Sequence, residues 1–199
     1  NCKIHGDQYP LPRKKSDMDK GEFNPKCDIC FMDLNLSPTD EKSKIHPTSI
    51  YGINKQQQEQ MVMLIGDSLG IPSVAFRYQN VYGPGQSLSN PYTGILSIFS
   101  TRILNGNDID VFEDGLESRD FVYIDDVVDA TILGIEKEEA NGEVFNVGSG
   151  MATSLKEIAE LLKNFYNSDI RINISGKYRL GDIRHNYADL NKTNALLGF

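Results

Sequence analysis

Tyr51 and Lys55 are four residues apart in a segment whose pattern predicts a helix, so both side chains project from the same helical face. A positive charge beside a phenol favours the phenolate and lowers the tyrosine pKa from its reference value of about 10. The pair is therefore a candidate general acid and base for an alcohol proton. The same spacing also fits an ordinary exposed helical pair, so its structural context must decide between the two interpretations.

Cys2 and His5 are separated by two residues, as are Cys27 and Cys30, and these pairs use all three cysteines of the chain. Such spacing lets two ligands from one turn reach a single tetrahedral ion. We therefore predict a structural zinc site on these four residues, because four protein ligands leave no open position for chemistry. Free thiols beside a surface histidine, or a Cys27–Cys30 redox pair, are the alternatives.

Two regions differ in their patterning. Residues 1–47 contain five of the eight prolines and no sustained hydrophobic periodicity, which predicts an irregular Cys/His insertion. From residue 48 to 199 strands alternate with helices, which predicts an α/β fold with a sheet that is parallel at least in part. The expected helices cover residues 50–69, 93–104, 125–135, 155–165 and 191–197, and the expected strands cover 74–81, 109–112, 120–124, 144–147 and 170–174.

Local signals set the ends of several elements. Thr48 or Ser49 is expected to cap the helix that carries Tyr51, and Gly70 to end it. The other expected caps are Asp125 or Asp126, and Thr153 or Ser154 with Glu157 as capping-box partner. The stretch 113–115 (Glu-Asp-Gly) predicts a turn of the hairpin type.

The composition limits the classes of partner. Twenty basic and 28 acidic residues give a net charge of −8, which repels a phosphate backbone and argues against nucleic acid as a partner. The sequence contains no apolar run long enough for a membrane helix and no signal peptide at its first residues, so we expect no membrane and a cytoplasmic location. An odd number of cysteines argues against a secreted disulfide framework.

Several ordered motifs place the Tyr-x-x-x-Lys pair in a family context. The chain resembles the extended short-chain dehydrogenase/reductase family of nucleotide-sugar epimerases and dehydratases. Within that family it looks most like the branch of UDP-glucose 4-epimerase and dTDP-L-rhamnose 4-epimerase. The resemblance covers residues 46–199 and is carried by five stretches, Tyr51–Lys55, Arg77–Pro84, Arg119–Val128, Phe145–Gly150 and Arg179–Asp189.

The resemblance implies the C-terminal part of a Rossmann-like doubly wound sheet, interleaved with a small α/β domain that binds the nucleotide-sugar substrate. It also implies bound NAD and C4 inversion through a 4-keto sugar. Tyr51 would take the C4 hydroxyl proton, and Lys55 would hold the nicotinamide ribose. The implied substrate contacts are Arg119 and Arg179 for the diphosphate, Asn80 for the sugar phosphate and Asp182 for the nucleotide ribose. Family members commonly form homodimers through the helix that carries the catalytic tyrosine.

Two family features have no match in the sequence. One is the third catalytic residue, a Ser or Thr on the strand before Tyr51. The other is the G-x-x-G-x-x-G loop that seats the NAD pyrophosphate, because the stretches 83–85 and 148–150 have the wrong spacing. We therefore interpret the chain as the C-terminal portion of an NAD-dependent 4-epimerase, inactive alone. A 4,6-dehydratase or decarboxylase of the same family, and a non-catalytic module that binds nucleotide sugars or partners, remain the alternatives.

Overall fold

In the computed structural model, which describes residues 1–87 and 94–199, the chain forms two units that each use three stretches of sequence. The first unit comprises Asn1–Leu36, Tyr82–Arg119 and Ala152–Asn186, and the second comprises Ser37–Val81, Asp120–Met151 and Tyr187–Phe199. The boundary at residue 36 falls inside the predicted insertion 1–47. None of the helices in the described residues has both the length and the apolar composition that a bilayer crossing requires.

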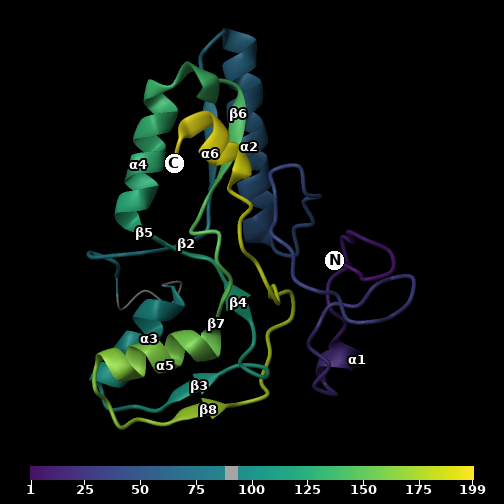
Figure 1. Ribbon diagram of the computed structural model, residues 1–199, viewed down its shortest axis with the longest axis vertical. Coiled ribbons are helices and arrows are strands. Elements are labelled where there is room, and N and C mark those ends of the chain that lie inside the picture. The colour runs from purple at the N-terminus through teal and green to yellow at the C-terminus, as the bar shows by residue number, and fades with distance from the viewer. Residues whose placement is uncertain (88–93) are drawn as a thin grey trace. The chain divides into compact units, whose positions relative to one another are not determined.

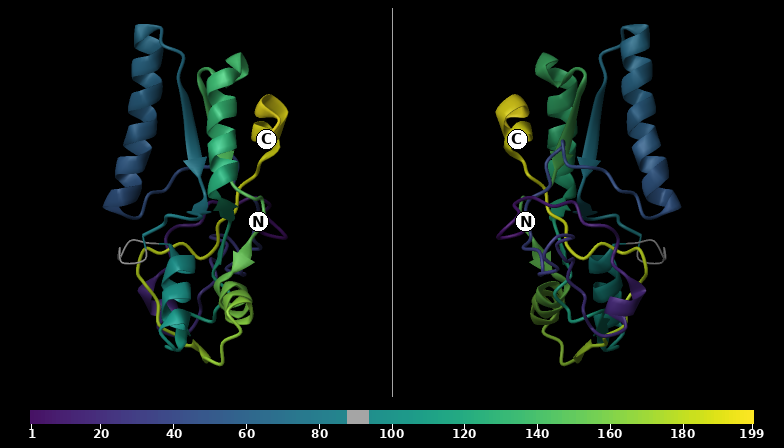
Figure 2. Two further views of the ribbon diagram at one scale, coloured as in Figure 1. Left: turned by 90° about the vertical axis from the view of Figure 1, so that its left-hand side faces the viewer. Right: turned by 90° about the vertical axis from the view of Figure 1, so that its right-hand side faces the viewer.

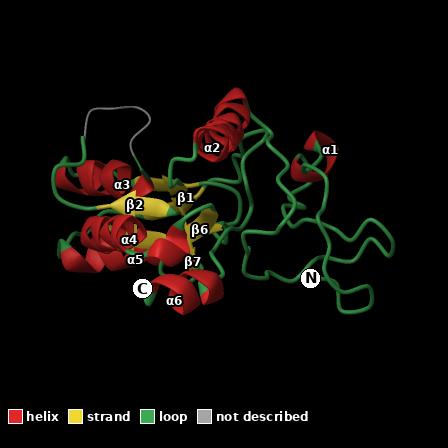
Figure 3. Ribbon diagram, turned by 90° about the horizontal axis from the view of Figure 1, so that it is seen from above, coloured by secondary structure: helices red, strands yellow, loops and turns green. Residues whose placement is uncertain are grey.

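The second unit is built on a parallel pair of strands, β1 (Val74–Tyr78) and β6 (Glu143–Val147), with Phe76 opposite Phe145. Helix α2 (Ile50–Leu69) contacts β1 on one side of this pair, whereas α4 (Ile124–Glu136) and α6 (Asn191–Leu197) lie on the other (Figures 1 and 3). Strand β2 (Asn80–Tyr82) pairs with β5 (Phe121–Tyr123), and the 3-10 helix η1 (Glu138–Ala140) precedes β6. Helices on both faces of a parallel pair confirm the predicted α/β class.

Helix α2 begins and ends where the local sequence predicts. The Ser49 hydroxyl accepts a hydrogen bond from the Gly52 N–H at 3.1 Å, which satisfies one of the unpaired donors of the first turn. Gly70 ends the helix with a φ of 64°, the left-handed conformation that favours glycine. These caps place Tyr51 and Lys55 inside α2, and because they are four residues apart they share a face of the helix.

Two contacts hold α2 alongside β1 (Figure 2). The Arg77 guanidinium on β1 donates two hydrogen bonds of 2.7 Å to the Glu59 carboxylate on α2, and this contact raises the pKa of Arg77. Nearer the helix C-terminus, Gly66 packs so closely on Ser73 that a Cβ at position 66 would lie 2.1 Å from the Ser73 hydroxyl oxygen. Arg77, which lies within a family motif, therefore has a structural role in holding the helix that carries Tyr51.

The core of the second unit lies between its strands and helices. Its buried apolar side chains are Val122, Val127, Ala130, Ala140, Phe145, Val147 and Leu197. Strand β5 passes into α4 with no intervening loop, so Tyr123 occupies the N-cap position without a side-chain cap. The predicted cap at Asp125 or Asp126 is therefore wrong. Both carboxylates lie in the first turn of α4, where they face the positive end of the helix dipole.

The first unit contains two further strand pairs and two helices of ten residues or more. Strand β3 (Ile109–Val111) pairs in parallel with β8 (Ile172–Ile174), and β4 (Ser118–Arg119) pairs antiparallel with β7 (Thr153–Ser154). Helix α3 (Ile95–Leu104) packs on α5 (Leu155–Phe165), and α5 contacts both β3 and β8. The start predicted for α3, at residue 93, lies outside the described residues. The core of this unit includes Phe99, Ile103, Ile109, Val111, Leu155, Ile158, Ala159 and Ile170.

The capping box predicted for α5 is confirmed, because Ser154 and Glu157 exchange side-chain to backbone hydrogen bonds. The turn predicted at 113–115 is present, since the Gly115 N–H donates to the Phe112 carbonyl at 3.0 Å. Its assignment to a hairpin is wrong, because the strand before it pairs with β8 instead. Backbone groups of that turn form hydrogen bonds with segments that are distant in sequence. The Glu113 N–H donates to the Lys177 carbonyl at 2.7 Å, and the Lys156 N–H donates to the Gly115 carbonyl at 3.1 Å.

Candidate functional site

Tyr51 and Lys55 lie side by side near the start of α2. The Lys55 ammonium nitrogen is 5.7 Å from the centroid of the Tyr51 ring, and it donates a hydrogen bond of 3.2 Å to the Gln58 side chain. Within the described residues no carboxylate forms an ion pair with Lys55. Because Tyr51 is 72% exposed, the phenol and the uncompensated ammonium are open to a ligand.

Asn80 and Asp120 lie in the same unit as this pair. The Asn80 N–H donates to the Asp120 carbonyl at 2.9 Å, where β2 begins. The fully buried Asp120 carboxylate accepts four hydrogen bonds of 2.7–3.1 Å, from the N–H groups of Ser149, Gly150 and Ala188 and from the Ser149 hydroxyl. Asp120 thus fixes the turn after β6. Sequence reasoning gave it no role, although it stands in the quoted Arg119–Val128 motif.

The residues expected at the substrate diphosphate and ribose lie in the first unit, and the structure brings Arg119 and Asp182 together. The Arg119 guanidinium is 3.2 Å from the Asp182 carboxylate and 3.5 Å from that of Glu117. Arg179 stands in the same turn as Asp182, whose N–H donates to the Arg179 carbonyl at 3.3 Å. The exposed Arg179 side chain lies over the Phe112 ring, 5.3 Å from its centroid.

A buried ionic cluster that the sequence did not predict adjoins these residues. Its centre is Glu113, 1% exposed, whose two carboxylate oxygens accept from Arg13 at 2.6 Å and from Arg184 at 2.8 Å. Arg13 also donates to the Asp182 carbonyl at 2.9 Å. A buried carboxylate is destabilising unless its charge is compensated, and the two arginines provide that compensation for Glu113. The cluster joins the N-terminal segment to the turn that carries Asp182.

Buried Glu117 and half-buried His185, both beside the cluster, have opposite pKa shifts. Burial and the nearby Glu113 carboxylate raise the pKa of Glu117 to about 7, against the opposing charge of Arg119. Burial and the positive charges of Arg184 and Arg119 lower the pKa of His185 to about 4. His185 Nδ1 and the Ser118 hydroxyl share a hydrogen bond of 2.8 Å. The imidazole is therefore neutral and bonded at neutral pH.

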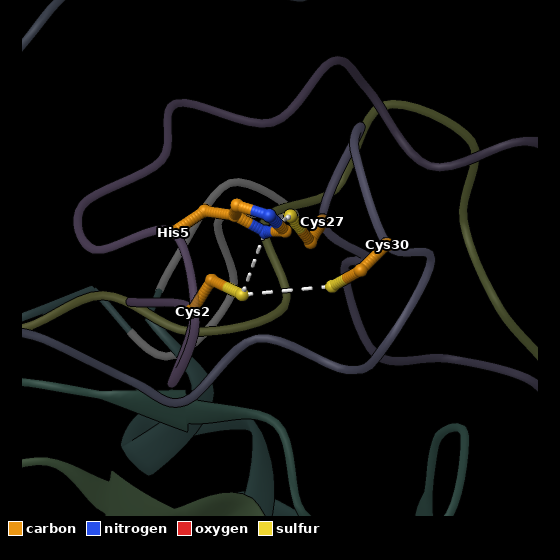
Figure 4. A group of neighbouring side chains, drawn as sticks. All are labelled: Cys2, His5, Cys27 and Cys30. Carbon is orange, nitrogen blue, oxygen red and sulfur yellow. Dashed lines mark hydrogen bonds between the residues drawn. The ribbon is translucent and has the colours of Figure 1, made fainter.

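The four Cys and His residues also come together (Figure 4). Their ligand atoms all lie within 4.8 Å of one another, although the two pairs are more than twenty residues apart in sequence. His5 Nδ1 is 3.6 Å from the Cys2 sulfur and 3.5 Å from the Cys27 sulfur. Backbone N–H groups of Ile4 and His5 lower the pKa of the Cys2 thiol to about 6, which favours the thiolate.

Comparison with known proteins decides the family. Residues 31–148 match the model of the NAD dependent epimerase/dehydratase family, which is more than half of the chain. The chain belongs to this family. The match includes the α2 pair, Asn80 and Asp120, and it ends at residue 148, directly after β6.

The chain is similar to curated proteins and solved structures of epimerases and a decarboxylase. It is 35% identical to the dTDP-L-rhamnose 4-epimerase of Burkholderia thailandensis over 192 residues, which is 96% of this chain and 51% of that protein. It is 36% identical over 123 residues to a UDP-N-acetyl-alpha-D-glucosaminuronate decarboxylase of Bacillus cytotoxicus, covering 61% of this chain and 37% of that protein. The crystal structure of a Thermotoga maritima UDP-glucose 4-epimerase with UDP-glucose matches with a TM-score of 0.77 and 36% identity, over 84% of this chain and 53% of that one. The chain thus spans about half the length of the epimerases it matches.

The residues present fit one end of the NAD that the family name implies. Tyr51 and Lys55 offer an exposed phenol and a cation to a ribose and a nicotinamide. The glycine-rich loop that seats a pyrophosphate at a helix N-terminus has no counterpart in the 199 residues. Of the groups that such a site needs, the described residues therefore offer this phenol and this cation.

Proposed function

We propose that this chain is the C-terminal portion of an NAD-dependent nucleotide-sugar 4-epimerase. The observation that carries the proposal is the exposed Tyr51–Lys55 pair on α2, with the ammonium 5.7 Å from the ring centroid. The relatedness to a dTDP-L-rhamnose 4-epimerase over almost the whole chain supports the same reaction class. NAD, when bound, would supply the hydride acceptor and donor that inversion at C4 requires.

Tyr51 has the role of general base and acid. Its phenolate oxygen takes the proton of the C4 hydroxyl as the 4-keto sugar forms, and it returns the proton when the alcohol is restored. Lys55 stabilises the phenolate by its positive charge and donates hydrogen bonds to the ribose of the cofactor. An exposed pair suits this role because both groups must reach a bound molecule.

The substrate diphosphate needs local positive charge in a chain of net charge −8. We assign this role to Arg119 and Arg179, the sugar-phosphate contact to Asn80, and the ribose contact to Asp182. Because Arg119 already pairs with Asp182 at 3.2 Å, a diphosphate must share or replace that contact. Release of the Asp182 carboxylate toward the ribose would follow from the exchange.

The apolar side chains of α2 support a proposal about association. Met61, Leu64 and Ile65, at the spacing of one helical face, are each more than half exposed. We propose that they pair with α2 of a second copy in a homodimer. We also propose that selectivity for base and sugar depends on the loop at residues 86–92 and on α3, and residues 88–92 of that loop lie outside the described residues.

The test compares the 199-residue chain alone with the same chain joined to the N-terminal half of an epimerase relative. We expect turnover of UDP- or dTDP-sugars only from the joined chain. In it, Tyr51→Phe should lower kcat by about 10²- to 10⁴-fold, because the proton acceptor is lost with little change of shape. Tyr9→Phe, which also removes an exposed phenol, is the matched control and should keep full activity.

The products distinguish the related reactions. A C4 epimer has the mass of the substrate, whereas a dehydratase product lacks one water and a decarboxylase product lacks CO₂. Full activity of the Tyr51→Phe variant would contradict the acid/base role. Binding of nucleotide sugars by the joined chain without any turnover would support a non-catalytic binding module instead.

A further inference from the structure

The Cys/His cluster has the dimensions of a tetrahedral metal site. The Cys2 and Cys30 sulfurs are 3.6 Å apart, and His5 Nδ1 is 3.6 Å from the Cys2 sulfur and 3.5 Å from the Cys27 sulfur. A tetrahedron whose corners lie about 2.3 Å from a central zinc has edges of about 3.8 Å. The three measured separations are close to such edges, and each atom comes from a different ligand residue.

The two ligand turns share two backbone features. In the first turn, Cys2 and Gly6 form two backbone hydrogen bonds, in which each N–H donates to the other residue's carbonyl. In the second turn the Phe31 N–H donates to the Cys27 carbonyl at 2.9 Å. The residue directly after the second ligand has a positive φ in both turns, 70° at Gly6 and 58° at Phe31. Phenylalanine rarely adopts this conformation, so the turn holds Phe31 in place against a conformational cost.

The segment that carries the cluster, Asn1–Leu36, has little apolar packing of its own. Its buried apolar side chains are Met18 and Phe23, and the cluster cysteines Cys2 and Cys27 are buried as well. Most other large apolar side chains of the segment, all of which the structure describes, are exposed: Ile4, Tyr9, Leu11, Ile29, Phe31, Met32 and Leu36. A segment of this length with so few buried apolar groups needs another source of stability.

We propose that Cys2, His5, Cys27 and Cys30 bind one structural Zn²⁺, which holds Asn1–Leu36 in its folded form. Three thiolates and one imidazole suit zinc and give it a closed shell of four ligands. Binding releases the protons of the thiols to solvent and needs no oxidant or reductant. This site lies outside the proposed reaction and has no part in its chemistry.

The position of the segment indicates what the metal stabilises. Arg13 donates to Glu113 at 2.6 Å and to the Asp182 carbonyl at 2.9 Å, and Asn24 accepts from Arg184 at 3.1 Å. The Tyr178 hydroxyl donates to Asp19 of the same segment. Loss of the metal would therefore loosen the contacts of the turn 178–184 as well as the segment itself.

The first measurement is the metal content of the 199-residue chain, purified in metal-free buffer after expression with zinc. We expect about one zinc per chain, and X-ray absorption at the zinc edge should give three sulfur neighbours and one nitrogen neighbour. Replacement by Co²⁺ should produce the intense visible absorption of a tetrahedral cobalt–thiolate centre. These measurements use the unmodified chain, so they do not depend on whether a variant folds.

Variants then assign the ligands. His5→Ala and Cys27→Ser should each lose the stoichiometric zinc, and protease should cleave these variants within residues 1–36 faster than the unmodified chain. His46→Ala is the matched control, because His46 is a half-buried histidine outside the cluster, and it should keep the metal. Zinc well below stoichiometry, bound iron in place of zinc, a Cys27–Cys30 disulfide found by mass spectrometry, or retention of zinc by both ligand variants would overturn the proposal.

Discussion

Glu117 is buried and His185 is half-buried beside the same ionic cluster, yet their pKa values move in opposite directions. The Glu117 carboxyl titrates at about 7 in the folded chain because burial and Glu113 disfavour its charge, while Arg119 opposes the shift. The His185 imidazole titrates at about 4 because burial and Arg184 disfavour its charge. Each group is therefore more easily ionised in the unfolded chain, and each makes the free energy of unfolding depend on pH.

The signs of the two contributions are opposite. Folded Glu117 keeps its proton between pH 4.5 and about 7, where unfolded Glu117 loses it, so its contribution to stability falls as pH rises through this range. Folded His185 stays neutral between about pH 4 and 6.5, where the unfolded imidazole is protonated, so its contribution falls as pH decreases. The two effects partly cancel in the unmodified chain.

Removing one group at a time should separate these effects. Relative to the unmodified chain, the free energy of unfolding of Glu117→Gln should rise with pH from 4.5 to 7, and that of His185→Gln should fall with pH from 4 to 6.5. Urea unfolding at several pH values measures both differences, and other groups cancel because they are common to all three proteins. Parallel curves for either variant and the unmodified chain would show that its pKa is not shifted.

The two ligand turns give a prediction at the scale of the element. Gly6 and Phe31 have φ values of 70° and 58°, and no atom lies within 4 Å of a Cβ at Gly6. Gly6→Ala therefore meets only the conformational cost, about 1–2 kcal/mol, and should weaken zinc binding by about tenfold. Phe31→Gly removes that cost and little burial, because Phe31 is 74% exposed, and should bind zinc at least as tightly.

Competition with a colorimetric chelator measures both affinities. Gly106→Ala is the control, because Gly106 has a φ of 66° with no neighbour within 4 Å but lies outside the zinc-binding segment. Gly106→Ala should have a conformational cost similar to that of Gly6→Ala, and it should leave the zinc affinity unchanged. Equal zinc affinity of Gly6→Ala and the unmodified chain would contradict the role given to this turn.

Elements whose ends depend on neighbouring residues could be predicted from the sequence. Ser49, Gly70 and the Ser154–Glu157 capping box act over three or four residues, and the helix ends follow from them. The pairing of β3 with β8 could not be predicted, because it joins residues more than sixty positions apart and depends on packing against α5. The sequence signal at 113–115 was local, and the actual partners of that turn are distant.

The candidate site divides in the same way. Helical spacing alone puts Tyr51 beside Lys55, and paired ligand spacing suggested the Cys/His cluster. The placement of Glu113 between Arg13 and Arg184 has no local signal, since its partners are about 100 and 71 residues away. The role of Asp120 could not be predicted either, because its four hydrogen-bond donors come from two later turns of the chain.

At the scale of the whole molecule, the exposed face of α2 needs an explanation. Gly66 is the buried residue of this 20-residue helix, whereas Met61, Leu64 and Ile65 are 53%, 66% and 54% exposed. An apolar stripe on a soluble helix normally faces a core or a partner. We therefore expect a partner surface on α2, the helix that carries Tyr51 and Lys55.

The proposed α2 homodimer can be tested by sedimentation of the 199-residue chain over a range of concentrations. We expect a monomer–dimer equilibrium, and each of Met61→Gln and Ile65→Gln should raise the dimer Kd by about tenfold. Burying an apolar side chain of this size contributes about 1.5–3 kcal/mol, which a polar amide largely forfeits. Leu161→Gln, at a 61% exposed position on α5, is the matched control and should leave the Kd unchanged. A monomer at every concentration, or an equal effect of Leu161→Gln, would contradict association through α2, because the stripe would then have no measurable partner in a second copy.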